Sequence, residues 1–152
     1  MILSGGQTGV DRGALDAALE VGVECGGWCP DGRTAEDGRI PDRYPLVELE
    51  GAGYAERTRR NVEDSDGTLI LCIGAPGGGT ALTLELSRVL SKPVCKIDAA
   101  IATAEEGAAQ ARAFVAEHGI HRLNVAGPRA SQWPDAHAYA RDVVRSLCSG
   151  AG

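Results

Sequence analysis

Apolar residues follow two patterns along the chain, and these patterns alternate. Short continuous apolar runs, typical of β-strands, occur as MILS, VECGGW, TLILCIG, PVCKI and RLNVAG. Between them, apolar residues recur every three or four positions, which predicts helices with one apolar face. The residues on these faces are Val10, Ala14, Leu15, Ala18 and Leu19; Tyr54, Thr58 and Val62; Leu82, Leu86, Val89 and Leu90; Ala104, Ala108, Ala111 and Val115; and Tyr139, Ala140, Val143, Val144 and Leu147.

Regular alternation of strands and helices predicts an α/β fold. The run TLILCIG is apolar without a break, so we expect it to form the central strand, covered by helices on both faces. The predicted architecture is a doubly wound, mostly parallel sheet of about five strands between two helical layers, which makes three layers in all. A chain of 152 residues has the size of one domain, so we expect a single domain over residues 1–152.

The segment CPDGRTAEDGRIPDRYP interrupts this alternation. It is rich in glycine, proline and aspartate, and too polar to predict a packed element. Long structureless loops are uncommon in compact domains and often carry function. In a doubly wound sheet, ligands bind beyond the carboxyl ends of the strands, so the loops that follow strands are the candidate site. These loops are GGQTGVDR, CPDGRTAEDGR, APGGGT and AGPRASQ.

Two of these loops are rich in glycine, although glycine costs roughly 0.5 to 1 kcal/mol more than alanine inside regular structure. Their glycines therefore indicate close approach of a ligand to the backbone. The helix that follows each loop carries about half a positive charge at its start, which favours a phosphate or carboxylate. The alternative is a pair of tight turns, with Asp11 only capping the first helix. Neither loop has the spacing of a P-loop or of G-x-G-x-x-G. The candidate anion-binding residues are Gly5, Gly6, Gln7, Thr8 and Gly9 in the first loop and Gly77, Gly78, Gly79 and Thr80 in the second.

Arginines near the same edge are further candidates, because the planar guanidinium matches a phosphate bidentately. We expect Arg33 and Arg57 to bind the ligand, followed by Arg129 and Arg12. Trp28 ends a predicted strand at this edge, where it can stack on a heterocyclic ring. The acids of the edge loops are expected to be solvated rather than catalytic, and they are Asp11, Asp31, Glu36 and Asp37.

Charge and composition narrow the class of partner. The net charge is −6 and the isoelectric point is near 5.0, which argues against a basic surface for nucleic acid or for an anionic membrane. No segment approaches the roughly 18 apolar residues of a membrane span, so we expect a cytoplasmic protein. The five cysteines are odd in number and lack paired ligand spacing, so no metal site is expected.

Five segments together resemble a known family. They are SGGQTGVDRGALDAAL, GGWCPDGRTAEDGRIPDRYPL, YAERTRRNVEDSDGTLIL, GGGTALT and LNVAGPR. In this order they look like the motifs of the putative molybdenum carrier family, a circularly permuted branch of the SLOG superfamily of Rossmann-like proteins. The resemblance implies a Rossmann-like fold and a nucleotide-like or pterin-phosphate ligand, and the family name records a role in holding molybdenum cofactor. It also implies a homodimer or homotetramer, in which the alanine-rich helix at 104–116 can pack against a neighbour.

The same superfamily includes the "lonely guy" enzymes, long labelled lysine decarboxylases, which cleave the N-glycosidic bond of nucleoside 5'-monophosphates. Their motif has an Arg about nine residues before a Ser-Asp or Ala-Asp pair, then a strand, then P-G-G-x-G-T-x-x-E. Arg57, Ser65 and Asp66 are similar to its first part. In its second part, PGGGT is one residue shorter, and Thr83 stands where the family has its catalytic Glu. Glu85 comes two residues later, which on a helix is a rotation of about 200°. Arg57 and Glu85 are thus the candidates for catalysis that the resemblance leaves.

We therefore expect a binding or carrier protein rather than an enzyme. Its ligand would be a phosphorylated heterocycle, either a nucleotide-derived ligand or the pterin phosphate of molybdenum cofactor. One alternative is a nucleotide-processing hydrolase that resembles the phosphoribohydrolases of nucleoside 5'-monophosphates, and another is a nucleotide-sensing partner subunit. Formation of product from nucleoside monophosphates would distinguish the hydrolase from the carrier.

Overall fold

A parallel β-sheet forms the centre of the protein. The computed structural model describes residues 1–149, and its main sheet has five strands in the order β2-β1-β9-β7-β8, every adjacent pair parallel. The strands are β1 (Ile2–Leu3), β2 (Cys25–Gly26), β7 (Gly67–Cys72), β8 (Val94–Asp98) and β9 (Leu123–Ala126). The predicted α/β fold with about five strands is confirmed. The middle position belongs to β9, while β7 is the longest strand and is buried along its whole length.

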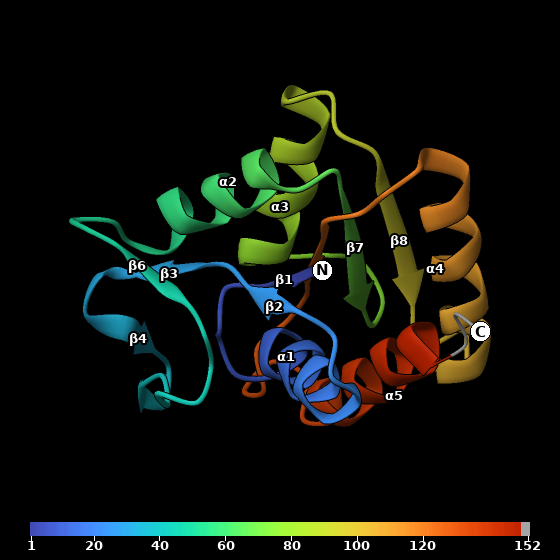
Figure 1. Ribbon diagram of the computed structural model, residues 1–152, viewed down its shortest axis with the longest axis horizontal. Coiled ribbons are helices and arrows are strands. Elements are labelled where there is room, and N and C mark those ends of the chain that lie inside the picture. Colours follow the sequence, from blue (N-terminus) through green and yellow to red (C-terminus); the bar gives the residue numbers. More distant parts are fainter. Residues whose placement is uncertain (150–152) are drawn as a thin grey trace.

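Helices cover both faces of this sheet (Figure 1). They are α1 (Val10–Val21), α2 (Tyr54–Asp64), α3 (Gly78–Val89), α4 (Ala104–His118) and α5 (Ala136–Ser149). The larger hydrophobic core lies on the face covered by α1, α4 and α5. There α1 and α5 approach so closely that a Cβ atom on Gly13 would clash with the carbonyl of His137. The other face is covered by α2 and α3.

The face under α2 and α3 is unusually polar. On the sheet, Asn124 donates a hydrogen bond of 3.2 Å to the Thr68 hydroxyl, and both residues are buried. On α3, the buried side chains are those of Thr80, Thr83 and Ser87 rather than the leucines. The hydroxyls of Thr83 and Ser87 each donate a hydrogen bond of 2.9 Å to a carbonyl one turn earlier in the helix.

The order of the strands reveals a permuted doubly wound sheet. If the strands are counted from β7 instead of β1, the order β8-β7-β9-β1-β2 becomes the 2-1-3-4-5 of the flavodoxin-like arrangement. The strand order reverses between β7 and β9. In such sheets the ligand crevice lies beyond the carboxyl ends of the strands at this point.

A small unit between β2 and α2 differs from the sequence-based prediction. The predicted strand VECGGW breaks at Gly27, whose φ is 134° and where a Cβ atom would clash with the Ser4 carbonyl. Beyond the break, β3 (Trp28–Pro30) pairs with β6 (Val47–Leu49), and β4 (Thr34–Ala35) pairs with β5 (Gly38–Arg39). A 3-10 turn, η1 (Asp31–Arg33), precedes β4.

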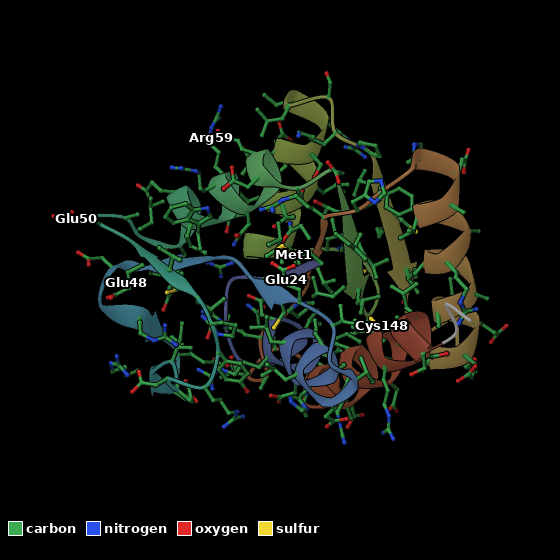
Figure 2. The ribbon with its side chains drawn as sticks, in the orientation of Figure 1. Met1, Glu24, Glu48, Glu50, Arg59 and Cys148 are labelled. Atoms are coloured by element: carbon green, nitrogen blue, oxygen red, sulfur yellow. The ribbon has the colours of Figure 1, made fainter. Side chains whose placement is uncertain are left out.

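The small unit packs a second hydrophobic core, to which α1 contributes Leu15, so the prediction that this segment packs no element is wrong. Its members are Leu15, Cys29, Ala35, Ile40, Tyr44 and Leu46. The sequence hides this core because its apolar residues are few and irregularly spaced. At the outer end of the unit, Glu48 and Glu50 point away from the main sheet (Figure 2). Within the described part of the chain, no helix has the length and apolar character that crossing a membrane requires.

Candidate functional site

A cavity of about 190 Å³ opens at the carboxyl edge of the main sheet. Its walls are the β1–α1 loop, the first turns of α2 and α3, and the loop that follows β9. These segments meet where the strand order reverses between β7 and β9, as the rule for doubly wound sheets requires. The cavity is therefore the candidate ligand site.

One wall of the cavity is the start of α3, where Gly78 and Gly79 face the open space. Among residues 1–149, a Cβ atom added at Gly77, Gly78 or Gly79 would meet no other atom within 4 Å. No contact with the described residues therefore requires a glycine at Gly77 or Gly79, although Gly78 has a φ of 51° that favours glycine. The N–H groups of Thr80 and Ala81 bond to the Gly77 carbonyl, so those of Gly78 and Gly79 precede the first helical bond. This turn presents open backbone donors to the cavity.

The glycines of the first loop have a different explanation. A Cβ atom at Gly5 would clash with the Arg57 guanidinium, one at Gly6 with Leu46, and one at Gly9 with the Pro128 carbonyl. Gly6 and Gly9 also have φ values of 82° and 83°. Backbone conformation and packing thus explain Gly6 and Gly9, while Gly5 leaves room for the Arg57 guanidinium. The expectation of two open glycine loops is supported only for the loop at α3.

Gln7 and Thr8 of the first loop bind other loops. Gln7 lines the cavity, and its Oε1 atom accepts from the N–H groups of Thr8 at 3.1 Å and Glu36 at 2.9 Å. Glu36 in turn accepts from the Thr8 hydroxyl and from the N–H of Ser131. Hydrogen bonds from the side chains of Ser131 and Thr8 hold the pKa of Glu36 below its usual range. Glu36 is exposed, as expected of a loop acid, and it also joins the loops after β1 and β9.

The buried charges of the cavity are Arg57 and Asp11. Arg57 lies in the first turn of α2 with its side chain 14% exposed, and its Nη1 atom is 3.5 Å from Oδ2 of Asp11. The Arg57 Nε atom is buried and has no acceptor within residues 1–149. Asp11, with its side chain 4% exposed, accepts a hydrogen bond of 3.2 Å from the N–H of Gln7. Burial raises the pKa of Asp11, and the charge of Arg57 opposes that rise.

The other candidate arginines are used differently. Arg33 is buried outside the cavity and donates to the carbonyls of Ile40, Pro41, Tyr44 and Leu46 at 2.7 to 3.2 Å. Its predicted role as a phosphate ligand is not supported, because its donors hold the small unit together. Arg12 binds both carboxylate oxygens of Asp37. Arg129 lines the cavity, with its Nε atom 3.8 Å from Glu36, so it stays a candidate ligand residue.

Trp28 lies outside the cavity lining. Its indole N–H donates to Asp64 at 2.6 Å, and the Arg60 guanidinium covers its ring at 4.3 Å from the centroid. This arrangement does not support the expected stacking on a ligand ring. The aromatic residue that does line the cavity is Tyr54, in the first turn of α2.

The two positions compared for catalysis face opposite ways on α3. Thr83 is buried and lines the cavity, whereas Glu85 is exposed and lies outside the lining. The rotation expected from a helix accounts for this difference. Thr58 and Gln132 also line the cavity, although sequence reasoning did not select them. The sequence signals that could have identified these two residues are their polar side chains and their position near the carboxyl edge of the sheet. Within residues 1–149, no group of three His, Cys, Asp or Glu side chains is placed to hold a metal ion.

The five-stranded parallel sheet with helices on both faces is Rossmann-like, and the candidate ligand site lies where its strand order reverses. Its strand order is a circular permutation of the flavodoxin-like order 2-1-3-4-5. The profile of the circularly permutated YpsA SLOG family matches residues 2–148, and the chain belongs to this family.

A solved structure is similar over almost the whole chain. It is the crystal structure of a protein named "putative molybdenum carrier protein" from Syntrophus aciditrophicus SB, with 42% sequence identity and a TM-score of 0.93. The similarity covers 96% of this chain and 92% of that chain. No curated protein matches the chain.

Proposed function

We propose that the protein binds or carries a phosphorylated heterocycle, with the phosphate at the start of α3. The observation that carries this proposal is the space above Gly77, Gly78 and Gly79, where added Cβ atoms would meet nothing within 4 Å. Glycines without a packing reason at a helix N-terminus are explained by a ligand that must reach the backbone. The helix dipole and the free N–H groups of this turn favour an anion.

The charges around the cavity support an anionic ligand. The Arg57 guanidinium has a single charged neighbour at 3.5 Å, Asp11, and makes no hydrogen bond to another described residue. A guanidinium has five N–H donors, so Arg57 retains donors for a ligand once its side chain adjusts. The side chain of Arg129 is 43% exposed, and its ion pair within residues 1–149 is the one with Glu36, at 3.8 Å. Arg129 can therefore turn toward an incoming phosphate.

The pterin phosphate of molybdenum cofactor is one candidate for the ligand, as the name of the similar solved protein suggests. The open turn at α3 fits its phosphate, and the polar groups of Gln7 and Asp11 fit the edges of a ring. Because residues 1–149 contain no metal-binding cluster, the chain would hold the organic part of the cofactor. The molybdenum would then travel as cargo on its own organic ligand. A nucleotide fits the same two features.

Binding is favoured over the phosphoribohydrolase reaction by one feature of α3. At the position where the enzymes that the chain resembles have their catalytic Glu, Thr83 faces the cavity, and Glu85 faces outward. Among the described residues, the carboxylate that lines the cavity is that of Asp11, which comes from α1. The hydrolase alternative is tested by incubating the protein with nucleoside 5'-monophosphates and measuring the release of free base. Turnover would contradict a carrier role.

The proposal is tested in two steps. Native mass spectrometry of the protein purified from its own cells, followed by denaturation, identifies any small molecule it carries. Calorimetric titration then measures affinity for GMP and for inorganic phosphate in the wild type and in Gly79→Val, where the added side chain fills the open space at α3. We expect at least about a tenfold loss of affinity, because the phosphate can no longer reach the backbone.

The matched control is Ala81→Val, which adds a comparable bulk on the exposed side of the same helix, outside the cavity lining. Its affinity should stay within twofold of the wild type. A protein that carries nothing and binds none of these compounds would contradict the proposal, as would equal losses in the two variants.

A further inference from the structure

The phosphate proposal leaves one feature of the cavity unexplained, which is a buried acid in its wall. Of the four edge-loop acids considered from the sequence, only Asp11 lines the cavity. The other three are Asp31, Glu36 and Asp37. The side chain of Asp11 is 4% exposed, and it lies in the first turn of α1, where the helix dipole favours a negative charge.

A carboxylate beside a bound phosphate repels it, so Asp11 and the phosphate should lie at opposite ends of the cavity. The sheet supports this separation. Asp11 follows β1 and the open turn of α3 follows β7, and β9 lies between these two strands. Two strand spacings correspond to about 10 Å. A ligand whose phosphate binds at α3 would therefore place its sugar or ring near Asp11.

The carboxylate of Asp11 has acceptor capacity that the protein does not use. Two carboxylate oxygens offer about four acceptor positions. Oδ2 takes one hydrogen bond, of 3.2 Å, from the N–H of Gln7, and faces Arg57 at 3.5 Å. The hydroxyl of Ser4 donates to the carbonyl of Val125 at 3.1 Å and is also near enough to Asp11 to oppose the rise in the pKa of its carboxyl. Positions for at least one further donor remain on a side chain that borders the cavity.

We infer that Asp11 accepts hydrogen bonds from O–H or N–H donors on the part of the ligand beyond the phosphate. The ligand class is a phosphorylated compound that carries either neighbouring hydroxyls, as on ribose, or a ring edge with N–H groups, as on guanine or a pterin. Asp11 thus determines specificity, while the start of α3 supplies affinity for the phosphate. This inference rests on the proposed function.

The test compares Asp11→Asn with the wild type by calorimetric titration of four probes. GMP carries both kinds of donor, 2',3'-dideoxyguanosine monophosphate keeps only the ring edge, ribose 5-phosphate keeps only hydroxyls, and inorganic phosphate has neither. We expect Asp11→Asn to weaken GMP binding by about tenfold and to leave phosphate binding unchanged or tighter. The probe that shares the loss with GMP identifies the donor that Asp11 contacts.

Two further variants keep the test decisive. Glu20→Gln removes one negative charge from the exposed end of α1 and should change none of the affinities. Asp11→Glu keeps the charge near Arg57 but moves the oxygens, so it should also lose GMP, and it replaces Asp11→Asn if that variant does not fold. Equal losses for GMP and phosphate would overturn the inference, because Asp11 would then act by positioning Arg57; unchanged GMP binding would overturn it as well. A wild type that binds none of the four probes would instead remove the proposed function, and this inference with it.

Discussion

At the scale of single residues, Gly79 is a position where helix stability and ligand binding favour different amino acids. It lies inside the first turn of α3, its φ is not positive, and a Cβ atom there would contact nothing within 4 Å. Alanine is the better helix former at such a position. The glycine is therefore costly for the helix and useful only to whatever occupies the cavity.

Replacement of Gly79 by alanine should separate these two effects. We expect Gly79→Ala to raise the free energy of unfolding by about 0.5 kcal/mol, because alanine reduces the freedom of the unfolded chain. The same substitution should weaken phosphate binding, because the methyl group enters the open space. Urea unfolding and titration of the same preparation measure both quantities. A variant that is more stable and binds equally well would show that nothing approaches this backbone.

Residue-scale roles were only partly predictable from the sequence. Arg33 and Arg57 look equivalent as arginines near one sheet edge, yet Arg33 donates to carbonyls of the small unit while Arg57 lines the cavity. Likewise, Gly5 and Gly79 both come from glycine-rich segments, but Gly5 makes room for the Arg57 guanidinium, which extends from α2. Local sequence identifies such loops, and only tertiary contacts reveal which of them is already filled.

At the scale of elements, α2 is fixed to the small unit through Trp28. The indole N–H donates to Asp64, and the backbone of Trp28 exchanges two hydrogen bonds, of 2.8 and 3.0 Å, with the side chain of Asn61. The side chain of Asn61 thus makes hydrogen bonds to the backbone of β3 like those of a neighbouring strand. These contacts set the position of α2, which brings Arg57 to the cavity at its other end.

The variant Trp28→Phe should therefore affect stability and not ligand binding. Loss of the indole N–H leaves Asp64 without that donor, and we expect the free energy of unfolding to fall by about 1 kcal/mol. In a domain of this size that corresponds to a decrease in Tm of roughly 2–4 °C. Thermal unfolding and titration with GMP check the two expectations. A tenfold loss of affinity with an unchanged Tm would instead indicate that Trp28 contacts the ligand.

The regular elements were predictable where their pattern was long and periodic. All five helices lie where apolar residues recur at helical spacing, and the five strands of the main sheet come from the predicted apolar runs. The small unit was not predictable, because its strands have two or three residues and its core is assembled from scattered positions such as Cys29, Ile40 and Tyr44. Gly27, which follows β2, is one of two neighbouring glycines, and nothing in the sequence marks it as the residue where the strand breaks.

At the scale of the whole molecule, the permuted order makes a direct prediction. A chain that begins at Asp66 and joins the present termini through a flexible linker would have the unpermuted order 2-1-3-4-5. Because the contacts within the sheet do not depend on where the chain starts, we expect this permutant to fold with an unchanged circular dichroism spectrum and to bind the same ligand. Loss of cooperative unfolding would show that the connection between α2 and β7 is needed for folding.

Assembly into a homodimer or homotetramer through the alanine-rich helix at 104–116 stays a prediction. In α4, Ala108 and Ala111 are fully buried and bring the helix close to the core of its own chain. Ala109, Ala113 and Ala116 are exposed, so the outer face of this helix stays the candidate contact. Light scattering of the purified protein will give the number of subunits.

The second core, in the small unit, has a consequence for how a ligand would enter and leave. The unit contacts the loops around the cavity through polar links, in which Arg12 binds Asp37 and Glu36 contacts Ser131 and Arg129, and through Leu46, which packs over Gly6. A segment with a small core and polar attachments opens locally for less free energy than global unfolding requires. Local opening of this unit would release the contacts that hold the loops after β1 and β9, which line the cavity, while the parallel sheet remains intact. The rate at which a bound ligand exchanges would then depend on this local opening rather than on unfolding of the sheet.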